Sequence, residues 1–164
     1  MKKVLILALS LIMLLGMTST AFAFDPVPKD QLKVGVIYIG DVIDLGYTYA
    51  HHQGTLAMQQ ALGLSDDQIL IQKNIAEDSS FETAARELID QGCQVIFGTS
   101  FGFMDYMEEL AEEYPNVIFS HCSGYKSNDT NFNNYFGRIW EARYLSGIAA
   151  GLKAKEIGNN HLGY

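Results

Sequence analysis

Several residue types are scarce in this sequence, and each scarcity argues against a class of protein. The chain has 164 residues, with 2 cysteines and 3 prolines, and 18% of its residues are charged. Two cysteines are too few for a disulfide-rich mini-protein. So little charge beside 48% hydrophobic residues argues against an intrinsically disordered chain, and no collagen-like repeat is present. A globular domain is therefore expected.

Basic residues are also scarce. Lysine and arginine together number 11, against 19 aspartates and glutamates, which gives a formal net charge of -8 at pH 7. A protein that binds the phosphate backbone of a nucleic acid needs a basic face. We therefore expect no nucleic-acid partner.

The longest apolar run lies at the N-terminus. Two lysines at positions 2 and 3 precede an apolar run over 4–17, and small residues follow at Ala21 and Ala23. This pattern predicts a secretory signal peptide over 1–23, with a linker over 24–31. The alternative, an uncleaved membrane anchor, needs about 20 apolar residues, more than this run supplies. No cysteine lies near the cleavage point to carry a lipid. We expect a periplasmic or otherwise extracytoplasmic protein without a lipid anchor.

Short apolar runs rich in β-branched residues alternate with helical patterns along the rest of the chain. Strands are predicted over 32–39, 68–72, 95–98 and 117–120 and around 135–136, with a polar loop over 123–134 and helices over 46–62, 81–91, 103–114 and 141–154. Such alternation is typical of an α/β fold with a doubly wound parallel sheet. The last helix is rich in small residues and is expected to pack closely. A sixth strand begins at His161 but is cut short after a few residues. We therefore expect the chain to be a fragment, or the first lobe of a longer protein.

The two cysteines are predicted to be free. Cys93 precedes one predicted strand and Cys122 follows the next, so the two residues lie at opposite ends of neighbouring parallel strands. A strand of four residues separates them by roughly 13 Å, whereas the Cα atoms of a disulfide lie within about 7 Å. We expect two buried thiols.

Motifs for nucleotide cofactors and for nucleophilic catalysis are absent from the sequence. GxGxxG, GxxxxGK[ST] and GxSxG do not occur. His51 and His52 are adjacent and point about 100° apart on a helix, so they cannot bind one metal as an i, i+4 pair would. We expect no cofactor, no metal site and no catalytic residue. The alternative is a small flavodoxin-like enzyme that uses Asp44, His121 or Cys122.

In an open parallel sheet, ligands bind beyond the carboxyl ends of the strands. This rule selects the segments 40–47, 99–103, 121–125 and 137–140, which all mix aromatic rings with hydrogen-bonding groups. Such a lining suits a flat ligand with polar edges. Alternatively, Tyr47 and Trp140 only cover the sheet, and Asp44 only caps a helix.

Three blocks of sequence together carry a family resemblance. They are GDVIDLGYTYAHHQG after the first strand, GTSFGFMDYMEELAEEYPNVIF across the third and fourth, and GRIWEARYLSGIAAG after the fifth. From 32 to 164 the chain resembles the BMP (basic membrane protein) family, the extracytoplasmic substrate-binding proteins of ABC importers, which includes a purine nucleoside receptor. The resemblance implies a two-lobed type I periplasmic-binding-protein fold that closes on its ligand.

The resemblance also assigns roles to residues. Tyr47 matches the family's stacking aromatic, Thr48 replaces an asparagine, and His121 stands where the family has an aspartate. Trp140 is a second stacking ring. The implied function is binding of a purine base or nucleoside by a monomer that delivers it to an ABC permease, and the alternative is a ligand sensor on the same fold. The predicted ligand-binding residues are Asp44, Tyr47, Thr48, Ser100, Phe101, Phe103, His121 and Trp140.

Overall fold

The computed structural model describes residues 26–159, 161 and 163. The chain divides into two units, 1–32 and 33–164. In the first unit the described residues, 26–32, contain the short 3-10 turn Lys29–Gln31. The predicted signal peptide lies outside the described residues. Among the residues that are described, no helix combines the length and the apolar character that a membrane crossing requires.

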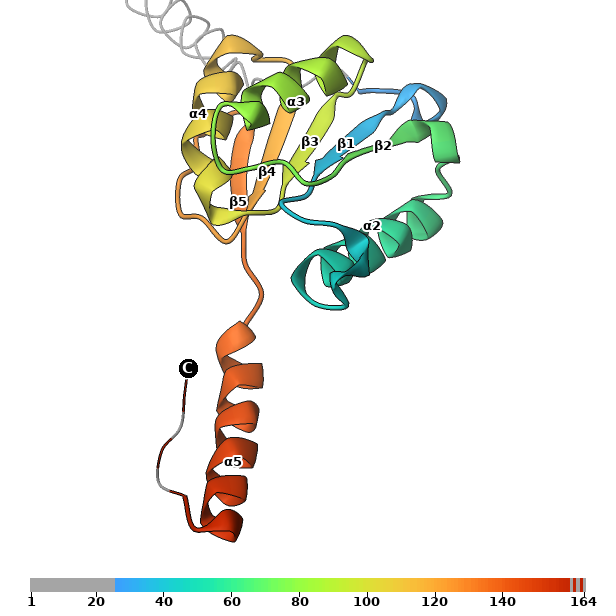
Figure 1. Cartoon of the computed structure of the whole chain (residues 1–164). Coiled ribbons are helices and arrows are strands. Elements are labelled where there is room, and N and C mark those ends of the chain that lie inside the picture. Colours follow the sequence, from blue (N-terminus) through green and yellow to red (C-terminus); the bar gives the residue numbers. More distant parts are fainter. Residues whose placement is uncertain (1–25, 160, 162, 164) are drawn as a thin grey trace, which may run out of the picture. The chain divides into compact units, whose positions relative to one another are not determined.

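The second unit is built on a five-stranded parallel sheet (Figure 1). Every neighbouring pair of strands in it is parallel, which confirms the predicted α/β class. Across the sheet the strand order is β2-β1-β3-β4-β5. The strands are β1 (Val34–Ile37), β2 (Ile69–Gln72), β3 (Val95–Gly98), β4 (Ile118–Cys122) and β5 (Phe132–Tyr135).

The strand order creates a switch point between β1 and β3. From β1 the chain first moves to one side to form β2, and then crosses to the other side of β1 to form β3. The loops that follow β1 and β3 therefore leave the sheet in opposite directions and open a crevice between them. This is the end of the sheet at which the sequence rule places a ligand.

Three helices pack on the sheet. Helices α3 (Ser80–Asp90) and α4 (Met104–Glu113) lie together over one face, and α2 (Tyr47–Leu62) lies over the other (Figure 1). Side chains alternate between the faces as strand geometry requires. Ile37 joins the core under α3 and α4, whereas the next side chain, Tyr38, faces α2 and has its hydroxyl 2.7 Å from that of Thr55.

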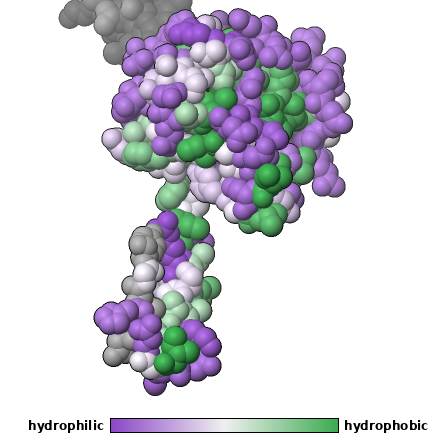
Figure 2. Space-filling view, in the orientation of Figure 1, coloured by the Kyte–Doolittle hydropathy of each residue, from purple (hydrophilic) through white to green (hydrophobic). Residues whose placement is uncertain are grey.

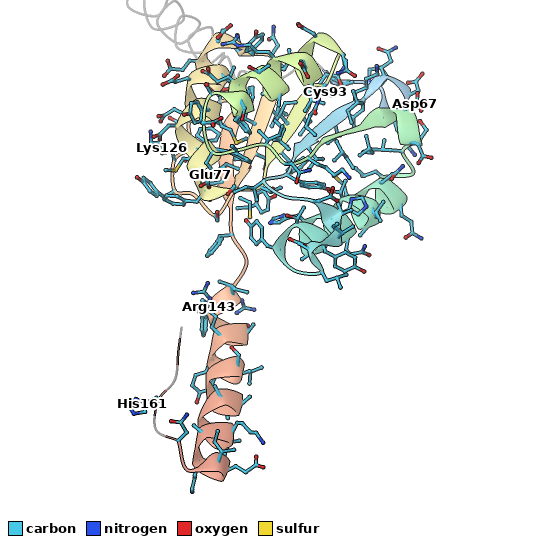
Figure 3. The ribbon with its side chains drawn as sticks, viewed as in Figure 1. Asp67, Glu77, Cys93, Lys126, Arg143 and His161 are labelled. Carbon is cyan, nitrogen blue, oxygen red and sulfur yellow. The ribbon has the colours of Figure 1, made fainter. Side chains whose placement is uncertain are left out.

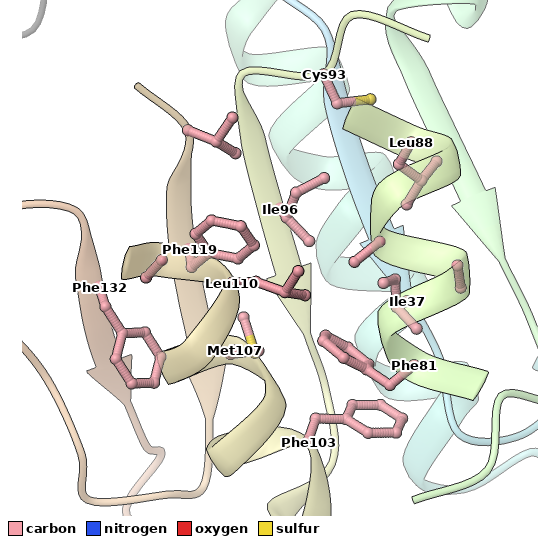
Figure 4. Close-up of a cluster of buried hydrophobic side chains, with 14 of the residues drawn as sticks. Ile37, Phe81, Leu88, Cys93, Ile96, Phe103, Met107, Leu110, Phe119 and Phe132 are labelled. Atoms are coloured by element: carbon pink, nitrogen blue, oxygen red, sulfur yellow. The ribbon is translucent and has the colours of Figure 1, made fainter. Parts of the chain in front are cut away.

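The main core lies between the sheet and helices α3 and α4 (Figure 4). The rings of Phe81 and Phe103 stack with centroids 4.5 Å apart. Gly35 keeps the backbone of β1 close to α3, because a Cβ there would lie 2.9 Å from Leu88. The other large buried side chains of this core include Ile96, Met107, Leu110, Phe119 and Phe132.

Two segments differ from the prediction. The fifth strand was expected around 135–136, but β5 runs over Phe132–Tyr135, because Phe132 enters the core and Asn131 anchors the strand's start. The Asn131 side-chain amide donates to the carbonyls of Ala111 and Val117 at 2.8 and 2.9 Å. The last helix, α5 (Ile139–Ile157), was expected to pack closely, but this helix, described in full, buries no residue. The strand expected from His161 falls on a segment of which only residues 161 and 163 are described.

The prediction of two free thiols is confirmed. Cys93 and Cys122 are unpaired and buried. Cys93 comes just before β3, and Cys122 is the last residue of β4, at the other end of the sheet. Burial raises the pKa of the Cys93 thiol to about 11 and also raises that of Cys122. Both thiols are therefore uncharged at neutral pH.

Candidate functional site

Tyr47 spans the switch point. It begins α2 after the β1 loop, and its hydroxyl donates to the carbonyl of Thr99, the residue after β3. Thr99 is bonded back to β1, since its amide and its hydroxyl donate to the Ile37 carbonyl at 3.2 and 3.0 Å. Burial of the hydroxyl, with the neighbouring Cys122 sulfur, raises the pKa of Tyr47 to about 12. Tyr47 therefore stays a donor and ties the two loops together, while the residue remains 48% exposed.

Asp44 caps helix α2. Its Oδ1 accepts from the amides of Gly46 and Tyr49, both at 2.9 Å, and its Oδ2 accepts from the Thr48 amide at 2.8 Å. The Gly46 and Tyr49 amides lower the pKa of Asp44 to about 2, so the carboxylate is charged at neutral pH. Both oxygens are thus engaged by the first turn of α2. This arrangement matches the alternative in which Asp44 serves as a helix cap. Thr48 itself is buried.

The turn after β3 divides its residues between surface and core. Ser100 is buried, Phe101 is 55% exposed and Phe103 is fully buried at 0%. Phe103 belongs to the core through its stacking on Phe81. Its ring therefore has no free face for a ligand, in contrast to the expectation, and it anchors the turn. Phe101 is the ring that this turn presents to solvent.

His121, on β4, links the turn after β3 to the neighbouring strand β5. Its Nε2 lies 2.7 Å from the Ser100 carbonyl, and its Nδ1 lies 3.0 Å from the side-chain nitrogen of Asn134. A carbonyl can only accept, so Nε2 carries the proton and Nδ1 accepts from the amide. Burial lowers the pKa of His121 and keeps it neutral. His121 was expected to pair with the edge of the ligand. It is instead 0% exposed with both ring nitrogens engaged, and it holds the turn after β3 against β5.

The sequence reasoning missed Glu77, and it selected the segment of Tyr125 without predicting Tyr125 as a ligand-binding residue. Glu77, in the loop after β2, accepts through Oε1 from the Ser100 hydroxyl at 2.6 Å and from the Gly102 amide at 2.7 Å (Figure 3). Tyr125, after β4, is exposed and has its ring centroid 6.3 Å from that of Phe101. The strand-end rule would have found Glu77 had it also been applied to the second strand.

An apolar pocket of about 1090 Å³ adjoins the crevice on the α2 side of the sheet. Tyr47 lines both the crevice and this pocket, and its hydroxyl lies 3.9 Å from the Cys122 sulfur at the pocket wall. Trp140, in the first turn of α5, is 64% exposed and is not among the lining residues. The pocket is walled by α2, by β1 and the ends of β3 to β5, and by the start of α5. Its lining includes His51, Phe97, Cys122, Tyr135 and Arg143.

The strand-end crevice, with its exposed rings and fixed polar groups, has the character of a small-molecule binding site. The family model described as ABC transporter substrate-binding protein, PnrA-like, matches residues 31–163. The chain belongs to this family. Its members are solute-binding proteins, which confirms the resemblance found in the three sequence blocks.

Individual relatives agree with this assignment. The chain is 38% identical over 128 residues to a purine-binding protein of Brucella abortus, covering 78% of this chain. It is 34% identical over 152 residues to a protein of Haloferax volcanii named as an ABC transporter glucose-binding protein, covering 91% of this chain. In both cases the matched part is 36% of the relative, so the chain spans about a third of the length of these relatives.

Solved structures share the fold. A solute-binding protein of an ABC transporter from Conexibacter woesei matches with a TM-score of 0.56 at 22% identity, over 73% of this chain and 40% of that one. A transcriptional activator of the comK gene from Bacillus halodurans matches with a TM-score of 0.53 at 22% identity, over 62% of this chain and 33% of that one. At this identity the likeness establishes the fold alone. It supports the expected α/β fold.

Proposed function

We propose that this chain is the first lobe of an extracytoplasmic receptor that binds a purine base or nucleoside and delivers it to an ABC permease. The observation that carries the proposal is the pair of exposed rings, Tyr47 and Phe101, which approach the switch point from the loops after β1 and β3. A signal peptide over 1–23 would export the receptor, which would act as a monomer.

A flat aromatic ligand fits these rings. A base stacked on an aromatic side chain gains about 1–3 kcal/mol, and this gain does not depend strongly on which base it is. One lobe offers only half of an enclosure, and a second lobe closing on the ligand would exclude water from its other side. Trp140, exposed at the start of α5, is the proposed second ring.

A purine is preferred to a sugar as the ligand, although one relative is named for each. Aromatic rings can also pack on a sugar, but sugar binding relies on many polar side chains around the hydroxyls. Here the polar groups at the crevice are few, and several are engaged within the protein: Asp44 by the amides of α2, and His121 by Ser100 and Asn134. A ligand bound mainly through ring faces suits this site better.

Isothermal titration calorimetry tests the proposal on the protein expressed from its complete reading frame. Adenine, adenosine and glucose are titrated into the parent protein and into Phe101→Ala, Phe101→Trp and Tyr144→Ala. Loss of stacking in Phe101→Ala should weaken purine binding by about tenfold or more, whereas Phe101→Trp should restore it. Tyr144→Ala, at an exposed ring of α5, is the matched control and should bind as the parent does. Binding of glucose and of neither purine would contradict the proposal.

A further inference from the structure

The side chain of Glu77 lies flat against the turn that carries Phe101. A Cβ at Gly102 would lie 2.6 to 2.8 Å from three carbon atoms of Glu77, so residue 102 must be glycine for this contact to form. The same carboxylate accepts from the Ser100 hydroxyl and the Gly102 amide, on the two sides of Phe101. Glu77 therefore contacts both residues that flank Phe101.

Only one of the two carboxylate oxygens holds the turn. Both hydrogen bonds end on Oε1, and within the described part of the chain Oε2 accepts no hydrogen bond. The Ser100 hydroxyl and the Gly102 amide hold the pKa of Glu77 below its usual range, so the group is charged at neutral pH.

We propose that Oε2 of Glu77 accepts an N–H or O–H group of the bound solute and is the main polar determinant of specificity in this lobe. The inference rests on the proposed function and deepens it. The ring of Phe101, between the two residues that Glu77 contacts, lies with its centroid 6.3 Å from that of Tyr125, so a flat ligand with a donor on its edge suits this site. An aminopurine or a nucleoside with free hydroxyls has such an edge.

The variant Glu77→Gln separates the two roles of this side chain. The carbonyl oxygen of glutamine can replace Oε1 as the acceptor for Ser100 and Gly102, while its NH₂ group replaces Oε2 and can only donate. The turn should keep its position, and the ligand should lose its acceptor. A hydrogen bond to a charged group predicts that adenosine binding weakens at least about tenfold.

Asp78→Asn is the matched control. It removes the same charge from the adjacent residue, whose carboxylate caps α3 by accepting from the Ser80 amide at 2.9 Å. Affinity for adenosine and glucose is measured by calorimetry for the parent and both variants, on the complete protein, together with their urea unfolding midpoints. The expected result is weaker binding in Glu77→Gln alone, with its midpoint unchanged.

The outcomes separate this inference from the proposed function. If the parent binds adenosine and Glu77→Gln binds it equally well, the inference is overturned and the proposed function stands. If the parent binds only glucose, the purine assignment fails. The Glu77 inference is then decided by comparing the glucose affinity of the parent with that of Glu77→Gln, because the hydroxyls of glucose can also donate to Oε2. Binding of neither solute overturns both. If Glu77→Gln unfolds, Glu77→Asp takes its place. The shorter aspartate keeps the charge but moves it away from the ligand, so binding should weaken. Unchanged binding in Glu77→Asp overturns the inference.

Discussion

Helices α3 and α5 differ in how their apolar residues are placed and in what those residues contact. In the 11 residues of α3 the buried side chains are Phe81, Ala84, Ala85 and Leu88, a single stripe that faces the sheet. In the 19 residues of α5 none is buried, and large hydrophobic residues are exposed all along it (Figure 2). A helix that is apolar on several faces is suited to burial on several sides. The apolar side of α3 is therefore buried within this sheet domain, whereas burial in the domain does not stabilise α5.

The largest expected difference between the two helices is in unfolding free energy. Leu88 on α3 is 1% exposed and Leu145 on α5 is 66% exposed. Leu88→Ala removes core packing and should destabilise the domain by about 2–5 kcal/mol, whereas Leu145→Ala should change its stability by less than about 0.5 kcal/mol. Urea denaturation followed by circular dichroism measures both. Equal losses would mean that α5 is packed in solution and would contradict the difference between the two helices.

Thiol reactivity should show a second large difference. Burial raises the pKa of Cys93 to about 11 and limits reagent access, so its modification at pH 8 should be about a hundredfold slower than that of a free thiol. A new thiol at the exposed Ser146 of α5, made by Ser146→Cys, should react at the rate of a free thiol. Reaction with a disulfide reagent, followed by absorbance, compares the two rates. A fast native thiol would contradict the buried placement of Cys93.

Acid should destabilise the start of α2. The folded pKa of Asp44 is lowered to about 2, so its capping contribution is present at pH values above its unfolded pKa of about 4 and is lost as the pH falls toward 2. The parent's stability should therefore fall between these values, and Asp44→Asn should be less stable at pH 7 and less sensitive to pH. Thermal unfolding at pH 7 and pH 3 tests this. A variant with the parent's full acid sensitivity would remove Asp44 as the cause.

The smallest expected effect concerns the intrinsic helix stability of α5. A Cβ at Gly147 would meet nothing within 4 Å. Gly147→Ala should therefore raise the helix stability of α5 by about 1 kcal/mol without moving the unfolding midpoint of the domain. Amide hydrogen exchange resolves the two regions. Reduced protection across α5 in the variant would show that position 147 packs against a close neighbour in solution.

Most helices and strands could be predicted from the sequence. Elements such as β3 and α2 combine a clear hydrophobic pattern with a glycine that ends them. The apolar run ending at Gly98 gave β3 its observed bounds, and the stop at Gly63 gave the end of α2. The fifth strand was misplaced because its sequence, FNNY, has one core residue among polar ones. Its position depends on Asn131, whose side chain contacts Ala111 in α4. This contact is distant in sequence and leaves no local pattern.

The site was less predictable than the fold. The position of Tyr47 and Phe101 followed from the rule on strand ends, since the rule concerns the backbone. The burial of His121 and Phe103 did not, because whether a residue at a strand end faces solvent depends on side chains of other elements, such as Asn134 and Phe81. Glu77 was missed because its role depends on a turn 23 residues away in sequence.

The decisive measurement is a crystal structure of the complete protein with bound adenosine. We expect the base to stack on Phe101 or Tyr47 at the switch point, with a donor of the ligand directed at Oε2 of Glu77. A nucleoside bound elsewhere, with Phe101 and Glu77 left facing solvent, would contradict it.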